Sequence, residues 1–368
     1  MIYDWGILFL TIIFASVIQK RCVFINDIHK KPCGWVAHYG NTGVYFGLLL
    51  ITLILYSGLR TNNNDTSSYI IGFEKLDTSL DVFSEGLFTD NAGFVFFEKI
   101  IKIVFGNNAT RFLTITSALT IIPTIVYFRK YSSDFVMASF IYVASTFYSF
   151  TMGAMKQTLA MAIGVWAVAA FFKKKYIIGA VLMVVAMSIH PLIAVYCAAL
   201  LMKEDVWKTK TIIVVIGTIV VAITFSQVFN TVADGLGYST EDLVDSEGTN
   251  ILRVLIWLLP TVLSFIYRTQ INSVCTQFNK LCINLMQIGS MCMILAGLGG
   301  ANLIGRTAYY FYPFFVLGYV EVVRVISIKQ NQMLKALCYL GFSALYFFLT
   351  IGPLFTDKME HVGISALF

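Results

Sequence analysis

Apolar runs of about 20 residues, the length that a helix needs to cross a bilayer, recur from one end of this chain to the other. Hydrophobic residues make up 58% of the 368 residues, and only 12% are charged. Globular proteins carry roughly twice that charged fraction. The sequence therefore predicts an all-α, polytopic integral membrane protein.

The positions of the apolar runs predict a single transmembrane domain over residues 1–368 with about 11–13 spanning helices. Segment 93–105 is too short and too charged for a span, and we expect an interfacial or re-entrant helix on the outer face. Polar residues gather in two outer loops, 60–92 and 230–250. The spans are expected at about 2–19, 42–59, 110–128, 134–152, 155–172, 176–190, 191–202, 211–229, 251–267, 281–299, 307–323 and 334–351.

Lysine and arginine residues set the expected orientation of these spans. They lie mostly in short clusters between alternate spans, such as Lys20-Arg21 and Lys173-Lys174-Lys175. The positive-inside rule places such clusters in the cytoplasm, so the N-terminus and the loop after the second span are expected outside. Because orientation explains the net charge of +6, we expect no nucleic-acid partner. No spacing of cysteine and histidine indicates a metal site, and we expect no cofactor.

Four cations do not fit this orientation: Arg60, Lys156, Arg253 and Arg306 lie at or near the outer ends of spans. A cation kept against the charge bias usually serves an anionic partner or a buried acid. Two simpler interpretations stay open. Lys156 can extend its amine to the lipid headgroups, and Arg253 can pair with acidic residues of the loop 230–250.

The segment that begins with Arg60 combines a cation with a proton acceptor. Asp65 follows five residues later, with three asparagines at 62–64 between them. One interpretation is an ordinary loop with a local ion pair. The other is a phosphate-binding arginine beside a carboxylate able to take a proton, with amides suited to sugar hydroxyls. Further along, Lys156 and Gln157 place an ammonium beside a carboxamide, which suits a diphosphate.

His190 and Arg306 begin two further candidate stretches. His190 precedes Pro191, which breaks the helix at the level of the outer loops. A lone histidine at a helix end is commonly structural, but an imidazole titrates near neutral pH and also serves as a general base or a pyrophosphate ligand. Arg306 precedes Tyr309 and Tyr310, which form either an interfacial aromatic belt or a sugar-stacking wall around a phosphate-binding arginine.

Taken in order over about residues 60–320, these motifs resemble the EpsG/Wzy family of polysaccharide polymerases, integral membrane glycosyltransferases of exopolysaccharide and O-antigen assembly. The family usually has arginine at the position of Lys156, so a point charge replaces a planar fork there. The matching positions are Arg60, Asp65 and Tyr69; the acidic-aromatic helix from Asn91 to Glu98; Lys156, Gln157 and the Thr-Leu-Ala that follows; Lys173 to Lys175; Ser188 to His190; and Arg306 with Tyr309 and Tyr310.

The resemblance implies a GT-C-like fold and transfer of glycan units at the outer face of the bacterial inner membrane. An undecaprenyl-diphosphate-linked glycan is the donor, and a second lipid-linked repeat supplies the attacking hydroxyl. Asp65 and His190 are the two candidates for the base, and turnover is expected to be metal-independent. Besides the lipid bilayer, a chain-length regulator is a candidate partner. The expected substrate-binding residues are Arg60, Tyr69, Glu98, Lys156, Gln157, Arg253, Arg306, Tyr309 and Tyr310, of which Arg60, Lys156 and Arg306 stabilise charge on the diphosphate.

A lipid-linked oligosaccharide flippase or another transporter is the main alternative. Transporters place ionisable groups near the bilayer midplane and carry repeated halves, and this sequence shows few mid-span charges and no repeat. A second alternative is a membrane glycosyltransferase that uses a polyprenyl-phosphate sugar, for which a loop aspartate such as Asp65 would also serve.

Overall fold

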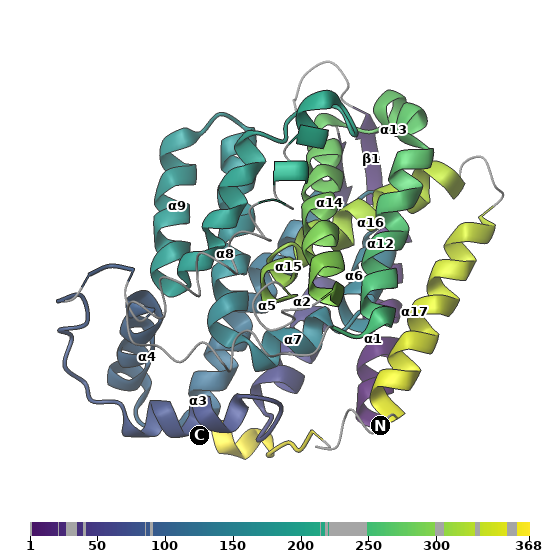
Figure 1. Ribbon diagram of the computed structural model, residues 1–368. Coiled ribbons are helices and arrows are strands. Elements are labelled where there is room, and N and C mark those ends of the chain that lie inside the picture. The colour runs from purple at the N-terminus through teal and green to yellow at the C-terminus, as the bar shows by residue number, and fades with distance from the viewer. Residues whose placement is uncertain are drawn as a thin grey trace. The chain divides into compact units, whose positions relative to one another are not determined.

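The structure is a computed structural model of the chain (Figure 1). It describes all residues except 1, 21, 27–34, 40–41, 85, 89–90, 214, 218–219, 221–248, 299–304, 328–331 and 352–358. Of the two outer loops expected from the sequence, most of 60–92 is described, whereas 230–250 lies outside the described residues except for its last two positions.

The described chain is almost entirely helical. Three helices are long and apolar enough to span a bilayer on their own: α5 (Ala109–Tyr131), α8 (Met155–Phe172) and α14 (Gln277–Leu298). Two bent pairs meet the same criterion together, α6 (Phe135–Ala144) with α7 (Phe147–Gly153), and α12 (Ile251–Ile266) with α13 (Arg268–Val274). The prediction of an all-α polytopic membrane protein is confirmed.

Five further helices contain shorter apolar segments, so the number of spans, 11–13, stays a prediction. The expected span at 211–229 lies largely outside the described residues. Where the helices are described, their bounds follow the expected spans closely. The five are α1 (Ile2–Lys20), α2 (Gly43–Gly58), α9 (Tyr176–Ile189), the 3-10 helix η1 (Pro191–Leu200) and α17 (Met333–Ile351).

Two expected spans are interrupted, and a small sheet was not predicted. The span at 134–152 bends by 51° between α6 and α7, where Thr146 has a left-handed φ of 72°. The span at 307–323 divides into α15 (Arg306–Tyr310) and α16 (Tyr312–Ser327). Pro313 explains the break, because it has no amide hydrogen to donate and its ring would clash with the carbonyl of Tyr309, four residues earlier, in a continuous helix. Between α1 and α2, β1 (Cys22–Asn26) and β2 (Trp35–Tyr39) pair as a two-stranded sheet.

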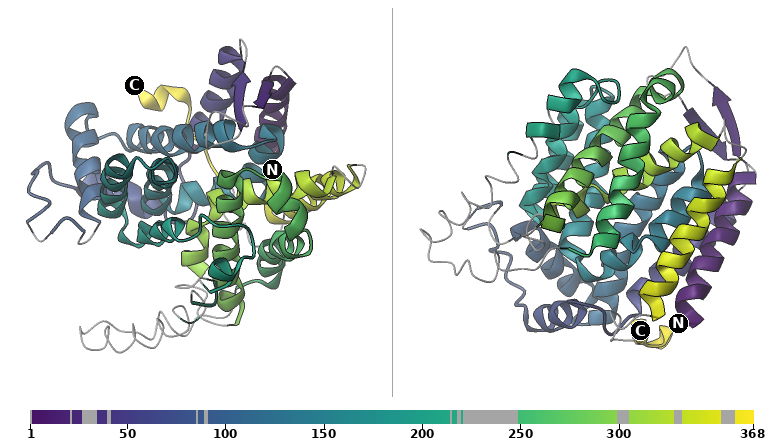
Figure 2. Two further views of the ribbon diagram at one scale, coloured as in Figure 1. Left: turned by 90° about the horizontal axis from the view of Figure 1, so that it is seen from above. Right: turned by 45° about the vertical axis from the view of Figure 1, so that its right-hand side comes forward.

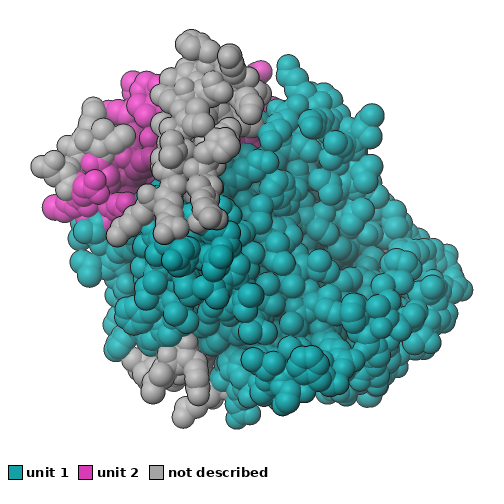
Figure 3. Space-filling view, turned by 180° about the vertical axis from the view of Figure 1, so that it is seen from behind, with its two compact units in different colours: residues 1–25, 36–196, 336–368 teal, residues 26–35, 197–335 magenta. Residues whose placement is uncertain are grey.

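The chain forms two compact units, which are described one at a time (Figure 3). Unit 1 comprises residues 1–25, 36–196 and 336–368, and unit 2 comprises residues 26–35 and 197–335. A single transmembrane domain over 1–368 stays a prediction.

In unit 1, α8 contacts both α5 and α9 (Figures 1 and 2). Most of its residues are buried. Many of its side chains are small, so neighbouring helices can approach closely. Such close packing holds helices together in a membrane, where water supplies no hydrophobic driving force between them. At Gly164, an added Cβ would lie 2.9 Å from the ring of Tyr196 in η1. The central position of α8 fixes the place of Lys156 at its first turn.

The last residues of unit 1 fold back onto the end of α2. Arg60 and His361 form an antiparallel bridge, and the amide of Thr61 donates to the Glu360 carbonyl at 2.9 Å. Arg111 holds the 3-10 helix η3 (Ile364–Leu367) through a 2.7 Å hydrogen bond to the Leu367 carbonyl. Figure 1 draws the N and C ends at the same end of unit 1, which is the end that the sequence predicts to be external.

In unit 2, α14 packs against α12 and α16. Buried hydroxyls link α12 to α14: Thr261 and Ser290 share a 2.7 Å hydrogen bond, and Ser290 also donates to the Trp257 carbonyl at 2.8 Å. Lys280 pairs with Asp205 at 2.7 Å. These bonds satisfy polar groups inside an apolar helix bundle.

Candidate functional site

Two irregular segments shape the candidate site in unit 1: the turn after α2, and the break between α7 and α8. Asn64 adopts a left-handed φ of 45°, which asparagine tolerates better than most residues. Its side chain lies against Gly153, where an added Cβ would be 2.8 Å from the side-chain nitrogen of Asn64. A side chain at position 153 would push the turn away from the end of α7, so the close approach depends on glycine.

Arg60, at the start of this turn, has only 2% of its surface exposed. Its guanidinium donates to the carbonyls of Ser57 and Met152, the latter at 2.8 Å, and to the Thr66 hydroxyl at 3.0 Å. These acceptors belong to the last turns of α2 and α7 and to the start of α3 (Thr66–Lys75), so the cation binds the carbonyl ends of two helices. Burial lowers the pKa of the Arg60 guanidinium to about 10, which leaves it charged at neutral pH.

Lys156 lies over two aromatic rings. Its Nζ is 5.9 Å from the centre of the Tyr69 ring in α3 and 5.5 Å from the centre of the Phe94 ring in α4 (Ala92–Phe105). The two rings meet edge to face with their centroids 6.1 Å apart. A cation held over a pair of ring faces is stabilised by their quadrupoles. Three segments far apart in sequence therefore meet around one ammonium group.

Glu98 follows Phe94 by one helical turn and is only 8% exposed. Within the described part of the chain it has no hydrogen bond or ion pair, and the Lys156 ammonium is its strongest favourable charge. Burial raises the pKa of the Glu98 carboxyl to about 7, and the positive charge of Lys156 opposes that rise. The same neighbourhood affects Tyr69, whose pKa burial raises, with Asp65 and Glu98 adding negative charge.

The helix that carries Glu98 turns its charged side chains toward the protein, among apolar ones, and leaves apolar side chains exposed. Lys99 is buried, whereas Ile103 and Val104 are 50% and 63% exposed. Lys99 and Lys102 point to the chain that leaves α3, where Lys99 pairs with Asp77 at 2.6 Å and Lys102 donates to three carbonyls. An outward apolar face suits contact with lipid, in agreement with the expected interfacial or re-entrant helix.

The remaining predicted residues of unit 1 lie around this cluster at different depths. Asp65 is exposed at the first turn of α3, and Gln157 is buried in α8. His190 ends α9, where its amide donates to the Ala186 carbonyl at 3.0 Å. Two residues earlier, Ser188 lies so close to Gly93 of α4 that an added Cβ would overlap its hydroxyl. The end of α9 is thereby joined to the helix that carries Glu98.

The predicted residues of unit 2 form a second group. Arg253, in the first turn of α12, donates to the Tyr309 hydroxyl at 2.9 Å. The Tyr309 ring stacks on Tyr312 with centroids 5.4 Å apart and planes 7° from parallel. Arg306 is exposed at the start of α15, and Tyr310 is buried. The structure therefore joins Arg253, for which the sequence also left open a pairing with the loop 230–250, to the Tyr309–Tyr312 pair.

The roles assigned from the sequence stay predictions. The structure gathers Asp65, Tyr69, Glu98 and Lys156 in unit 1, and Arg253 with Tyr309 in unit 2. Convergence of Arg60, Lys156, His190 and Arg306 on one diphosphate is likewise still a prediction. In the described part of the chain, no group of three histidine, cysteine, aspartate or glutamate side chains is placed to hold a metal ion.

The model of one protein family, described as the EpsG family, matches residues 43–352, which is most of the chain. The chain belongs to the EpsG family. No curated protein and no solved structure matches it. All the candidate residues of this EpsG family member, from Arg60 to Tyr310, lie within the matched range.

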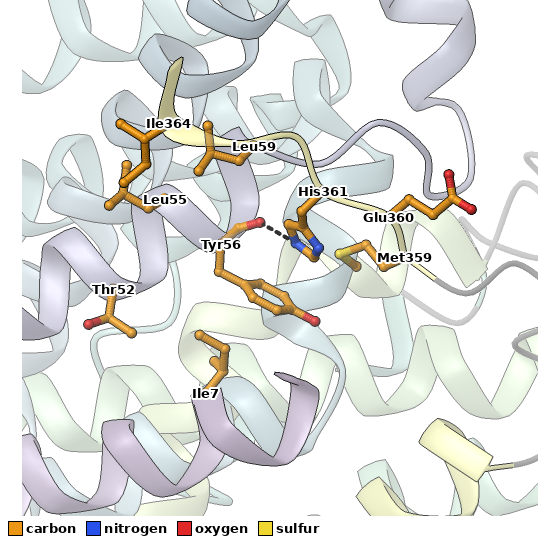
Figure 4. A pocket seen from close by; sticks show the side chains of 9 residues that line it. All are labelled: Ile7, Thr52, Leu55, Tyr56, Leu59, Met359, Glu360, His361 and Ile364. Carbon is orange, nitrogen blue, oxygen red and sulfur yellow. Dashed lines mark hydrogen bonds between the residues drawn. The ribbon is translucent and has the colours of Figure 1, made fainter. Parts of the chain in front are cut away.

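A cavity of about 730 Å³ at the end of unit 1 was not predicted, and it lies partly outside the matched range (Figure 4). Its polar groups come from Thr52, Tyr56, Glu360 and His361, and the centre of the His361 ring lies 4.6 Å from that of the Tyr56 ring. The His361 Nε2 donates to the Tyr56 carbonyl at 2.9 Å. No local signal could have revealed this contact, because the two residues are 305 positions apart.

Proposed function

We propose that this EpsG family protein is a membrane glycosyltransferase that polymerises lipid-linked oligosaccharide repeats at the outer face of the bacterial inner membrane. Membership in the family supports a polysaccharide polymerase function at the family level. The observation that carries the proposal is the Lys156 ammonium, held over Tyr69 and Phe94 beside the Glu98 carboxyl. One site then offers a cation, a partly exposed tyrosine ring and a proton acceptor, which are groups that suit glycosyl transfer from a diphosphate.

The chemistry follows from these groups. The donor is an undecaprenyl-diphosphate-linked glycan, and its leaving group is a lipid diphosphate whose growing negative charge needs cations nearby. Lys156 supplies one, and Arg306 at the start of α15 is proposed to supply another. The ring of Tyr69, which is partly exposed, suits stacking against a sugar, and the buried Phe94 supports it from behind. Asp65 and His190 are the base candidates that the sequence offers, and a chain-length regulator is a proposed partner.

Arg60 has a different part in this proposal. Its donors already bind the ends of α2 and α7. It would therefore act on the diphosphate only by exchanging one of those carbonyls for a phosphate oxygen. In the arrangement described, it positions the first turn of α8, and with it Lys156.

A deletion strain tests the proposal most directly. Loss of a polymerase should leave surface glycans that carry a single repeat, because each repeat is still exported and attached. Loss of a flippase should instead remove the repeats from the surface entirely, and that result would refute the polymerase assignment. With the purified protein, transfer that stops when a chelator is added would contradict metal-independent turnover.

The outer placement of the site needs its own test. A reporter fused after Asp65 should report an external position, and one fused after Lys175 should report a cytoplasmic position. The reverse pattern would place the cluster on the cytoplasmic side of the membrane, where polymerisation of exported repeats cannot occur.

A further inference from the structure

Glu98 differs from the other carboxyl groups near the candidate site in its surroundings. It is buried on the protein-facing side of α4, whereas Asp65 is exposed at the start of α3. The two lysines on its own helix are directed elsewhere: Lys99 binds Asp77 and the Ser79 carbonyl, and Lys102 binds carbonyls of the chain leaving α3. Neither of these two cations neutralises Glu98.

The surroundings of Glu98 come from four other helices. The start of α3 contributes Tyr69, whose ring Asp65 also approaches, and the start of α8 contributes Lys156. Helix α9 packs on α4 through Ser188 and carries His190 at its end. Helix α5 also contacts α4, and its Arg111 binds the Phe105 carbonyl at the far end of α4. Among the residues that the structure describes, Lys156 is the cation that acts on Glu98.

We infer that Glu98, rather than Asp65 or His190, is the group that takes the proton from the attacking sugar hydroxyl, an assignment that rests on the proposed polymerase function. As the hydroxyl oxygen bonds to the anomeric carbon of the donor, its proton passes to the Glu98 carboxylate. The bond from that carbon to the diphosphate oxygen breaks, and its electron pair leaves with the lipid diphosphate. Lys156, beside Glu98, faces the negative charge that forms.

The surroundings of Glu98 suit this role better than those of Asp65. Asp65 is exposed to solvent, whereas Glu98 is buried beside a cation. A general base is most effective when its pKa lies near the working pH. Burial brings the pKa of Glu98 to about 7, and the Lys156 ammonium keeps it from rising further.

The test compares Glu98→Gln with Asp65→Asn in the purified full chain, given a lipid-linked oligosaccharide. Transfer rates are measured from about pH 5 to 9, the range in which such groups titrate. Glu98→Gln keeps the size of the side chain and removes the base. Its rate should fall about 100-fold or more, with little change in the KM for the acceptor. The decline in rate toward low pH that we expect for the wild type should be absent from Glu98→Gln. Glu74→Gln, on the exposed side of α3, is the control and should keep both the rate and its dependence on pH. Asp65→Asn should keep the decline of the rate toward acid, because it leaves Glu98 in place.

Three results would overturn the inference. A Glu98→Gln rate within about threefold of the wild type, far short of the loss expected for a missing base, would remove Glu98 from the chemistry. A loss of acid dependence in Asp65→Asn would assign the base to Asp65. Absence of transfer by the wild-type protein would refute the polymerase function itself, which keeps the two failures distinct. If Glu98→Gln does not fold, Glu98→Asp must retain the acid dependence, because it retains the carboxyl.

Discussion

The Arg60 guanidinium donates a 2.8 Å hydrogen bond to the Met152 carbonyl, which joins the turn after α2 to the last turn of α7. Three residues beyond Met152, the Met155 sulfur accepts from the same nitrogen at 3.1 Å. The break between α7 and α8 is thus anchored to Arg60 on both sides. Lys156 follows immediately, so its position over Tyr69 depends on a cation that does not touch it.

Arg60→Ala should therefore destabilise the protein as well as lower activity. It leaves the buried Ser57 and Met152 carbonyls without donors, at about 1–3 kcal/mol for each unsatisfied group. Arg60→Lys should lose less, because one donor remains. The measurement is the free energy of unfolding in detergent, with the exposed Arg253→Ala as the control, expected within about 0.5 kcal/mol of the wild type. An Arg60→Ala protein of unchanged stability but no activity would instead make Arg60 a substrate ligand.

The helices of this protein could be predicted from sequence because each depends on a local apolar run. The expected span at 155–172 and the helix α8 have the same bounds, and α1, α2 and α9 differ from their expected spans by at most one residue at either end. The breaks were harder to predict. Pro191 predicted the end of α9. Thr146, which has a left-handed φ and lies inside an apolar run, gave no sequence signal for the break between α6 and α7.

Side-chain surroundings could not be predicted, because they depend on how distant helices pack. Arg60 was expected to face a phosphate, and its acceptors at Met152 and Met155 are 92 and 95 positions away. Glu98 entered the candidate site only through its motif. Its burial beside Lys156 depends on α4 lying against α9 at Gly93 and Ser188, a contact that no local pattern encodes.

His361 should make the stability of the protein depend on pH. Burial lowers the pKa of the His361 imidazole, despite its hydrogen bond to the Tyr56 carbonyl. The folded state therefore binds a proton less readily than the unfolded state, whose histidine titrates near pH 6.5. The contribution of His361 to stability should be complete above about pH 6.5 and decrease as the pH falls below it. As the pH falls across this range, the unfolding temperature of His361→Gln should decrease less than that of the wild type. An equal decrease in both proteins would show that His361 does not cause the pH dependence.

Lys102 should hold the chain that leaves α3. Its Nζ donates to the carbonyls of Phe73, Glu74 and Leu76 at 3.0, 2.9 and 2.7 Å, which closes the last turn of α3. Hydrogen bonds to a charged donor contribute about 1.5–3 kcal/mol. Lys102→Met should therefore raise the rate of hydrogen exchange at residues 73–76 about tenfold or more, since about 1.4 kcal/mol is tenfold. The exposed Lys75→Met is the control, and equal rates in both variants would show that Lys102 does not close this turn.

Lys156 should control the pH at which transfer begins. Its ammonium lowers the pKa of Glu98, so Lys156→Gln should raise that pKa. Because the proposed base acts when ionised, the acidic limit of transfer should move to higher pH, together with a lower maximal rate from the weaker stabilisation of the diphosphate. Lys156→Arg keeps the charge over Tyr69 and Phe94 and should keep the acidic limit of the wild type. Lys75→Gln, on the exposed end of α3, is the matched control. If Lys156→Gln transfers with an unshifted acidic limit, then Glu98 and Lys156 are not coupled, and the base must lie elsewhere.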